Sequence, residues 1–300
     1  MSERFTVKGT YDLHVHCGPE PIPRRYTFGQ LDCALRSSGM AGAVAKSHCH
    51  STAPWAAALG EDGLLFGSIT LNYHVGGINP DAVRGSLGLG AERALRIVWM
   101  PTIHAAGHVR MQRAHGQEYD IPAEWTGGAL SPGSRPLDSI KPISIFDPPV
   151  RAALEEVLDI IRDNGLALAT GHLTREEVLD LVPLAKQKGV RSVILTHPLY
   201  HATSLTDDDL ASLTAFDGVY AEQSYGLMLI DRFPLSDIVR QIRRVGPEKT
   251  ILTSDLGQGQ TPPPAEGMQT FFDLLAAEGF TNAELQRMAL DNPKKILGIE

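Results

Sequence analysis

Short apolar runs alternate with amphipathic segments along almost the whole chain. The runs are rich in β-branched and small residues, and each is too short for a typical helix of a globular protein. This pattern predicts a buried strand in each run. The predicted strands lie within 9–18, 42–48, 64–71, 96–104, 166–172, 192–197, 218–223 and 250–255.

The segments between these runs carry helical spacing with readable ends. Leu31 and Leu35 lie one turn apart, and Gly39 follows a helix predicted over 28–38. Thr174 and Glu177 form a capping-box pattern, while Pro183 predicts a kink or an early break in that helix. Further helices are predicted over 149–164, from 206, over 234–245 and 265–279, and from Thr281.

Strand, helix and strand repeated in this order predict right-handed crossovers and a parallel sheet. Eight such strands close most naturally into a (β/α)₈ TIM barrel, which we expect as one α/β domain over residues 1–300. The structural alternative is a doubly wound open sheet. It is disfavoured because polar residues follow most strands, whereas an open sheet gathers them at one switch point.

The segment 105–142 does not fit the repeat. It is long, rich in glycine and proline, and follows the fourth predicted strand. Loops of this length are usually functional, so we interpret it as a lid-like insertion with Tyr119 and Trp125 facing the substrate. The alternative is a surface excursion or a contact between subunits of a homo-oligomer.

The composition is that of an ordinary globular protein, with 43% hydrophobic and 21% charged residues. A net charge of −8 argues against nucleic acid or an anionic membrane as a partner. No apolar stretch is long enough to span a membrane, and the first residues lack a signal peptide's apolar region. Three cysteines without zinc-finger spacing fit reduced thiols, so a cytoplasmic protein is expected.

Histidines gather at the carboxyl ends of the predicted strands. Six of the eleven histidines lie there: His14, His16, His48, His104, His172 and His197. His14 and His16 share one face of their strand, because residues two apart in a strand point the same way. Asp255 ends the last strand, although a helix N-cap is an alternative role for it. In a parallel barrel all of these ends meet at one rim.

Imidazole and carboxylate are the ligands of catalytic zinc, which lowers the pKa of bound water towards ~7. The chain resembles the amidohydrolase superfamily of metal-dependent barrel hydrolases. That family has His-x-His after strand 1, histidines after strands 5 and 6, and an aspartate after strand 8. The resemblance implies a divalent metal, zinc or else manganese, held as one or two ions. Its ligands would be His14, His16, His172, His197 and Asp255, with Asp255 also moving the proton.

The chain differs from the family pattern at the residue that would bridge two metal ions. The bridging lysine or glutamate is expected on strand 4, but this strand offers His104, and the lysine at a strand end is Lys46 on strand 2. A carboxylated Lys46 would bridge two metals, whereas an unmodified Lys46 would be a cation that orients substrate. His48, two residues later on the same face, is either a ligand or a substrate contact. Glu222 is expected to hold a neighbouring imidazole.

A second resemblance is to the PHP phosphoesterases, which also open with His-x-His and follow it with a histidine after strand 2. The chain lacks that family's acid before this histidine, its glutamate after strand 3 and its final Asp-x-His. A barrel that only binds a ligand is a third alternative.

Residues that follow the strands supply candidates for substrate binding: Arg24, Arg25, His104, Tyr200 and His201. Arginine pairs with carboxylate or phosphate through two parallel hydrogen bonds, and solvated arginines on a loop are the alternative for Arg24 and Arg25. Together with the first resemblance, these residues predict a metal-dependent hydrolase of a small amide, cyclic imide or lactone. Lys46, His48 and Asp255 would be its catalytic groups.

Overall fold

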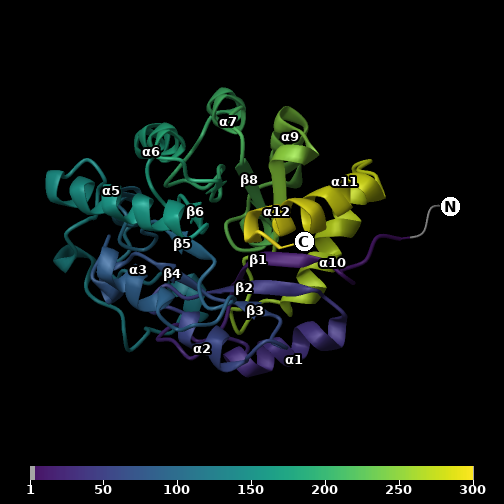
Figure 1. The fold of residues 1–300 in the computed structure, drawn as a ribbon, viewed down its shortest axis with the longest axis horizontal. Coiled ribbons are helices and arrows are strands. Elements are labelled where there is room, and N and C mark those ends of the chain that lie inside the picture. The colour runs from purple at the N-terminus through teal and green to yellow at the C-terminus, as the bar shows by residue number, and fades with distance from the viewer. Residues whose placement is uncertain (1–3, 300) are drawn as a thin grey trace.

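The structure, a computed structural model, describes residues 4–299 as an α/β fold in which the strands pair in parallel (Figure 1). Its strands are β1 (Tyr11–His16), β2 (Gly42–Lys46), β3 (Leu65–Phe66), β4 (Ser68–Thr70), β5 (Ile97–Trp99), β6 (Ala167–Ala169), β7 (Ser192–Leu195), β8 (Val219–Ser224) and β9 (Thr250–Thr253). Its helices are α1 (Phe28–Ser38), α2 (Ala53–Ala58), α3 (Pro80–Leu87), α4 (Ala106–Ala114), α5 (Pro148–Asp163), α6 (Arg175–Gln187), α7 (Asp207–Thr214), α8 (Tyr225–Leu229), α9 (Leu235–Val245), α10 (Pro264–Ala277), α11 (Asn282–Gln286) and α12 (Asn292–Leu297). Helices surround the strands on the outside in Figure 1.

The strands form two parallel sheets, with the orders β1-β2-β3 and β4-β5-β6-β7-β8-β9. Within each sheet the neighbours follow chain order without a reversal. A doubly wound sheet requires such a reversal, so that alternative is wrong. The third predicted strand is divided at Gly67 into β3 and β4. β3 pairs with β2 in the first sheet, and β4 pairs with β5 in the second.

The end of β1 lies against the segment that follows β9. Val15 and Leu256 form a parallel bridge, and the Asp255 amide donates to the His14 carbonyl oxygen at 2.8 Å. The His16 amide donates to the Leu256 carbonyl oxygen at 2.7 Å. The first and last strand ends are therefore held side by side, although they are far apart in the sequence.

Gly257 makes this close approach possible. Its φ of +134° is a conformation that side chains rarely adopt, and a Cβ there would lie 1.9 Å from the His16 carbonyl oxygen. The Arg25 amide donates to the Gly257 carbonyl oxygen at 2.7 Å and fixes the same crossing. Only glycine fits where the chain leaves β9.

Both sheets bury side chains in one cluster. Its members are Leu13, Val44, Phe66, Ile97, Trp99, Ala167, Ala169, Ile194, Tyr220, Ile251, Ile296 and Leu297. Ile296 and Leu297 belong to α12 and close this cluster from one side. Side chains of both sheets thus pack into one apolar cluster, and the polar residues at the strand ends lie outside it.

Several helices begin and end where the sequence predicts. Gly39 terminates α1 with a φ of 74°, and Thr174 and Glu177 form the capping box of α6. The early break expected at Pro183 is wrong, because α6 continues to Gln187. Pro183 is exposed while Leu181 and Val182 are buried, so the missing backbone hydrogen bond lies on the solvent side and packing holds the helix.

The segment 105–142 leaves and returns at adjacent backbone. The Ala106 amide donates to the Ile143 carbonyl oxygen at 2.9 Å, and the Ile143 amide donates to the His104 carbonyl oxygen at 2.8 Å. Between these points lie α4 and two short 3₁₀ turns, Ala123–Thr126 and Leu137–Ser139. The two ends of this insertion are therefore hydrogen-bonded to each other.

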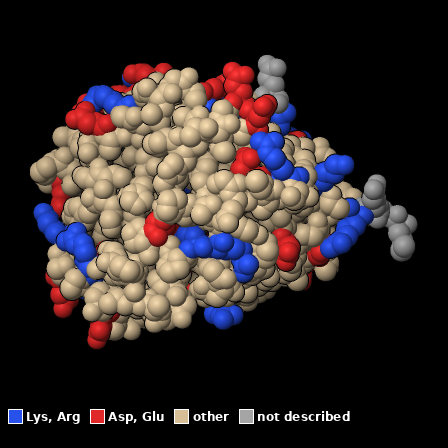
Figure 2. Space-filling view, turned by 90° about the horizontal axis from the view of Figure 1, so that it is seen from below, with Lys and Arg blue, Asp and Glu red and all other residues tan. Residues whose placement is uncertain are grey.

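On the face shown in Figure 2, acidic and basic side chains are interspersed along the edges and across the lower middle of the face. The net charge of −8 is therefore not gathered into one patch on this face. Among residues 4–299, no helix has both the length and the apolar character needed to cross a membrane.

Candidate metal centre and active-site pocket

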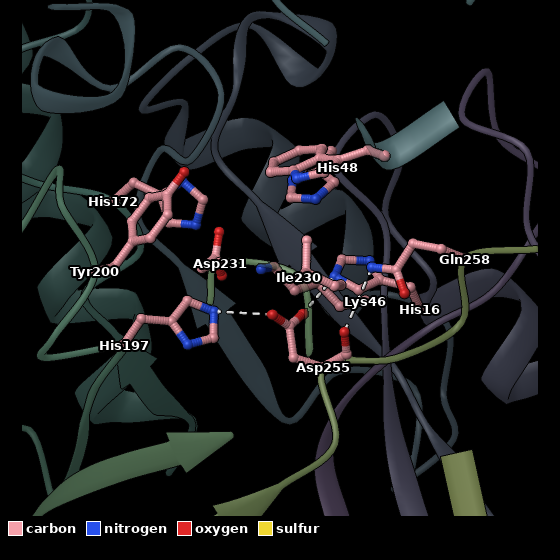
Figure 3. A pocket seen from close by; sticks show the side chains of 11 residues that line it. His16, Lys46, His48, His172, His197, Tyr200, Ile230, Asp231, Asp255 and Gln258 are labelled. Atoms are coloured by element: carbon pink, nitrogen blue, oxygen red, sulfur yellow. Dashed lines mark hydrogen bonds and ion pairs between the residues drawn. The ribbon is translucent and has the colours of Figure 1, made fainter. Parts of the chain in front are cut away.

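A partly open pocket lies at the carboxyl ends of the strands, with about 370 Å³ of space between its lining atoms when open solvent is counted. Figure 3 shows side chains from distant parts of the chain pointing into it. It is lined by His16, Lys46, His48, Trp125, His172, His197, Tyr200, Ile230, Asp231, Asp255 and Gln258. The convergence of strand ends predicted from the sequence is confirmed for most of the histidines.

Asp255 is the centre of the cluster. Its Oδ1 lies 3.0 Å from His14 Nε2 and 3.0 Å from His16 Nε2, and its Oδ2 lies 3.3 Å from His197 Nε2. The shared face predicted for His14 and His16 is confirmed, since both rings reach the same oxygen. Asp255 is not a helix N-cap, because the next helix, α10, is preceded by Pro263.

Glu222 lies beneath two of these rings and is fully buried. Its Oε1 is 2.7 Å from His14 Nδ1, and its Oε2 is 3.5 Å from His197 Nδ1. Burial alone would raise the pKa of Glu222, but the His14 and His197 imidazoles lower it to about 2, so it is a carboxylate. A carboxylate accepts, so His14 carries a proton on Nδ1, whereas Glu222 Oε2 has no hydrogen-bond partner and faces His197 only as a charge. The Asp255 carboxylate raises the pKa of His14 against the effect of burial.

Lys46 faces the same point. Its Nζ lies 2.9 Å from His14 Nε2 and 4.5 Å from the centre of the Trp99 ring. Burial lowers the pKa of Lys46 to about 8, although Asp255 and Glu222 oppose this effect. The ammonium form donates to His14 Nε2, as expected if that nitrogen carries a lone pair.

This donor set fits a divalent cation. His14 Nε2 lies 2.9 Å from Lys46 Nζ and 3.0 Å from Asp255 Oδ1, and a proton or a metal cation between the last two atoms makes their contact favourable. Ligand atoms of His14, His197 and Asp255 all lie within 4.8 Å of one another. Imidazole nitrogen and carboxylate oxygen are ligands that zinc takes in catalytic sites.

Two residues of the cluster have unusual backbones. His197 has a φ of 45° and Asp255 a φ of 51°, in the left-handed region that non-glycine residues seldom enter. Such a conformation costs about 1–3 kcal/mol per residue and is found mostly at functional sites. Here it turns both side chains inward at the ends of β7 and β9.

The opposite side of the pocket holds imidazoles with uncharged partners. His172 Nδ1 lies 3.0 Å from His108 Nδ1, and the Tyr200 hydroxyl is 3.3 Å from the same atom. His48 Nδ1 is 2.8 Å from Thr102 Oγ1. Burial lowers the pKa of His48, His172 and His108, so these rings are neutral at pH 7.

The insertion contributes to this side. Trp125 stacks on His48 with ring centres 4.9 Å apart and lines the pocket, as expected for a substrate-facing aromatic residue. His108, on α4 of the insertion, supports His172. Sequence reasoning missed His108 because it follows no strand; its only signal was a histidine in a segment interpreted as functional.

Asp231 and Gln258 also line the pocket and were missed. Asp231 follows the short helix α8, and Gln258 follows Gly257 in the loop after β9. Burial, aided by the nearby carboxylates of Asp255 and Glu124, raises the pKa of Asp231 to about 8. A protonated carboxyl group can donate a hydrogen bond to a ligand, which its usual form cannot.

Four of the five predicted substrate contacts do not line this pocket. His104 is buried, with Nδ1 accepting from the Tyr73 amide at 3.1 Å and Nε2 lying 3.0 Å from Asp120 Oδ2. His201 is exposed and packs on Phe233.

The third is Arg25, whose Nε donates to the Thr261 carbonyl oxygen at 2.9 Å. The side-chain nitrogens of His104 and Arg25 are thus used by the chain itself.

Arg24 lies next to the site but behind His16. Its Nε donates to Glu20, and its Nη2 lies 3.1 Å from His16 Nδ1. The side chain is 2% exposed, so the fork that was expected to hold a substrate anion is directed at a histidine.

The fold is shared with amidohydrolases of known structure. A protein named as a candidate dipeptidase, PvdM from Pseudomonas aeruginosa, aligns with a TM-score of 0.59 at 9% identity, covering 97% of this chain and 95% of the other. A candidate 2-pyrone-4,6-dicarboxylic acid hydrolase from Pseudomonas putida aligns at 0.54 and 16% identity, covering 97% and 98%.

An amidohydrolase from Burkholderia multivorans with bound zinc aligns at 0.51 and 11% identity, covering 97% and 100%. The expected resemblance to this superfamily is confirmed at the level of the fold.

No curated protein matches the chain. A family model does match it over residues 9–222, which is more than half of its length. The chain therefore belongs to DUF6282, a family of unknown function.

Proposed function

We propose that this chain is a metal-dependent hydrolase of a small amide, cyclic imide or lactone. The observation that supports this most strongly is the convergence of His14, His197 and Asp255 at the floor of a pocket, with ligand atoms within 4.8 Å of one another. The hydrolases among the structural neighbours agree with this reading.

The proposal includes a closed eight-stranded barrel, in which β3 and β4 count as one strand divided at Gly67. In favour of closure are the apolar cluster shared by both sheets and the bridge between Val15 and Leu256. A closed barrel brings every strand end to one rim, which explains how β1, β2, β7 and β9 supply a single pocket.

His14, His197 and Asp255 would hold the metal, with His172 across the pocket as a further ligand. Zinc is the ion we propose, with manganese as the alternative. When bound, such an ion supplies Lewis acidity and lowers the pKa of water. A second ion would require a carboxylated Lys46, whose Nζ lies 2.9 Å from His14 Nε2.

The side chains around the centre would position substrate and move the proton. The water oxygen bonds to the carbonyl carbon, its proton passes to Asp255, and Asp255 returns a proton to the leaving nitrogen or oxygen. Burial raises the pKa of Tyr200 well above its usual value, so its hydroxyl stays protonated and can donate to a developing oxyanion. Trp125 and neutral His48 would hold the planar substrate.

The test combines metal content with a substrate panel. Elemental analysis of protein prepared without chelator should find zinc or manganese, and at least one class in a panel of lactones, cyclic imides and amides should be hydrolysed with either metal. Asp255→Asn should lower kcat by about 10²–10⁴-fold while most of the metal remains bound. Asp81→Asn, at an exposed residue of α3, is the matched control and should leave kcat unchanged.

Three results would contradict the proposal or a part of it. Full activity of Asp255→Asn would remove the assigned role of Asp255. Turnover of p-nitrophenyl phosphates, with the carbonyl substrates untouched, would favour the phosphoesterase alternative. Metal without turnover of any substrate would favour a barrel that only binds a ligand.

A further inference from the structure

The loop after β1 brings a buried ion pair against the site. Arg24 pairs with Glu20, and their side chains are 2% and 0% exposed. The second oxygen of Glu20 accepts from the Ser47 hydroxyl and, at 3.1 Å, from the His48 amide. The pair therefore links the loop after β1 to the end of β2 and holds the guanidinium in one place.

The guanidinium determines where His16 carries its proton. Arg24 Nη2 lies 3.1 Å from His16 Nδ1, and an arginine has only donors, so this ring nitrogen must accept. An imidazole whose Nδ1 accepts carries its proton on Nε2. His16 Nε2 lies 3.0 Å from Asp255 Oδ1, and its N–H is therefore directed at a carboxylate oxygen.

His14 and His197 have the opposite arrangement. Their Nδ1 atoms face the Glu222 carboxylate, at 2.7 Å for His14 and 3.5 Å for His197, whereas His16 Nδ1 faces a guanidinium. The three imidazoles around Asp255 thus differ in their second partner. His14 and His197 face the Glu222 carboxylate, and His16 faces the Arg24 guanidinium.

We propose that His16 is not a metal ligand, because Arg24 holds it as an Nε2–H donor to Asp255. Arg24 is then a positioning residue, and the ligand set expected from the His-x-His pattern loses one member. The metal assignment rests on the proposed function, whereas the proton position of His16 does not. His16 then fixes the orientation of the Asp255 carboxylate through Oδ1. Oδ2, which lies 3.3 Å from His197 Nε2, remains available to a metal ion.

The proton position can be measured on metal-free protein by long-range ¹H–¹⁵N correlation of the histidine rings. The His16 signals are identified by their loss in His16→Gln. A protonated, pyrrole-type Nε2 and an unprotonated Nδ1 are expected at His16. The reverse pattern, with the proton on Nδ1, would overturn the inference.

The role of Arg24 is tested in the double variant Glu20→Gln/Arg24→Gln. Removing both members avoids leaving one buried charge without its partner. His16 should then show a mixture of both tautomers. Arg25→Gln is the matched control, since its guanidinium bonds to the Gly259 and Thr261 carbonyl oxygens, and it should leave the His16 spectrum unchanged. A double variant with an unaltered His16 spectrum would remove the assigned role.

Metal affinity separates a ligand from a hydrogen-bond donor. Zinc affinity is measured by competition with a chromophoric chelator. Glutamine keeps an N–H, so His16→Gln should weaken zinc binding by less than about 10-fold, whereas His14→Gln should weaken it by more than about 100-fold. Equal losses in both variants would show that His16 is a ligand. Wild-type protein that binds neither zinc nor manganese would remove the proposed function and the metal assignment together, and the ring spectrum would still decide the tautomer.

Discussion

The two sides of the pocket use histidine differently. On the side of β1, β8 and β9, each ring contacts a charged group, namely Glu222, Asp255, Lys46 or Arg24. On the side of the insertion, His48 contacts a threonine, and His172 contacts another neutral imidazole. A charged partner fixes which nitrogen carries the proton, whereas a neutral partner can both donate and accept. The first side is therefore suited to holding a cation. On the second side, His48 is suited to contacting a substrate, and His172 is the one metal ligand proposed from it.

Gly257→Ala should have the largest effect, because it disrupts the backbone crossing that supports the charged side. The new Cβ would lie 1.9 Å from the His16 carbonyl oxygen at a φ of +134°. We expect a loss of more than about 4 kcal/mol in the free energy of unfolding, measured by urea denaturation. Gly259→Ala is the control, since no atom lies within 4 Å of its added Cβ, and it should be near neutral. Similar free energies of unfolding for the two variants would contradict the close approach of the Gly257 backbone to His16.

Glu222→Gln should disrupt the charged side without changing its shape. An amide cannot accept from both His14 and His197, so zinc affinity should fall by about 10–100-fold in a chelator competition. Thr253→Val removes only the hydroxyl that donates to Glu222 Oε1 at 2.9 Å. It should cost about 1 kcal/mol of stability and leave zinc affinity unchanged. Unchanged zinc binding in Glu222→Gln would mean that the carboxylate does not orient the ligands.

His108→Leu tests the neutral side in the same way. It removes the partner of His172 but no charge, so zinc affinity should fall by less than about 10-fold. Gln112→Leu, which removes only the 3.3 Å contact to His108 Nε2, is the milder comparison. A loss as large as that of Glu222→Gln would mean that charge is not what distinguishes the two sides.

Trp125→Ala should have the smallest effect and should act on substrate alone. Loss of an aromatic contact worth about 0.5–1.5 kcal/mol should raise KM by about 2- to 10-fold, with kcat and zinc affinity retained. Trp55→Ala is the control, because Trp55 packs on Phe28 outside the pocket. A change in zinc affinity in Trp125→Ala would place this tryptophan among the groups that support the metal.

The residues at the strand ends could be predicted from the sequence, because the apolar runs locate each strand and the residues that follow it. His14, His16, His172, His197 and Asp255 follow apolar runs, and parallel strands bring such residues to one edge. Hydrogen-bond direction could not be predicted in this way. Nothing in the spacing of Arg24 shows that it returns beneath His16 rather than facing a substrate.

The residues that were missed or misplaced depend on the folding of loops. His108, Asp231 and Gln258 reach the pocket from segments without strand periodicity. His104 follows a strand as the ligands do, but the insertion supplies Asp120 and so makes it a buried structural residue. A strand-end position therefore indicates proximity to the rim, and only the neighbouring loop decides what the side chain contacts.

The base of the insertion has an evolutionary consequence. Because Ala106 and Ile143 join its two ends by a backbone hydrogen bond, the 105–142 segment can be lengthened, shortened or replaced while the strands beneath it keep their positions. The residues proposed to bind metal lie in β1 or within three residues after β6, β7 and β9, and Trp125 comes from the insertion. An insertion of another length could therefore change what the pocket accepts, provided that the contacts of His108 to His172 and of Asp120 to His104 are kept or replaced.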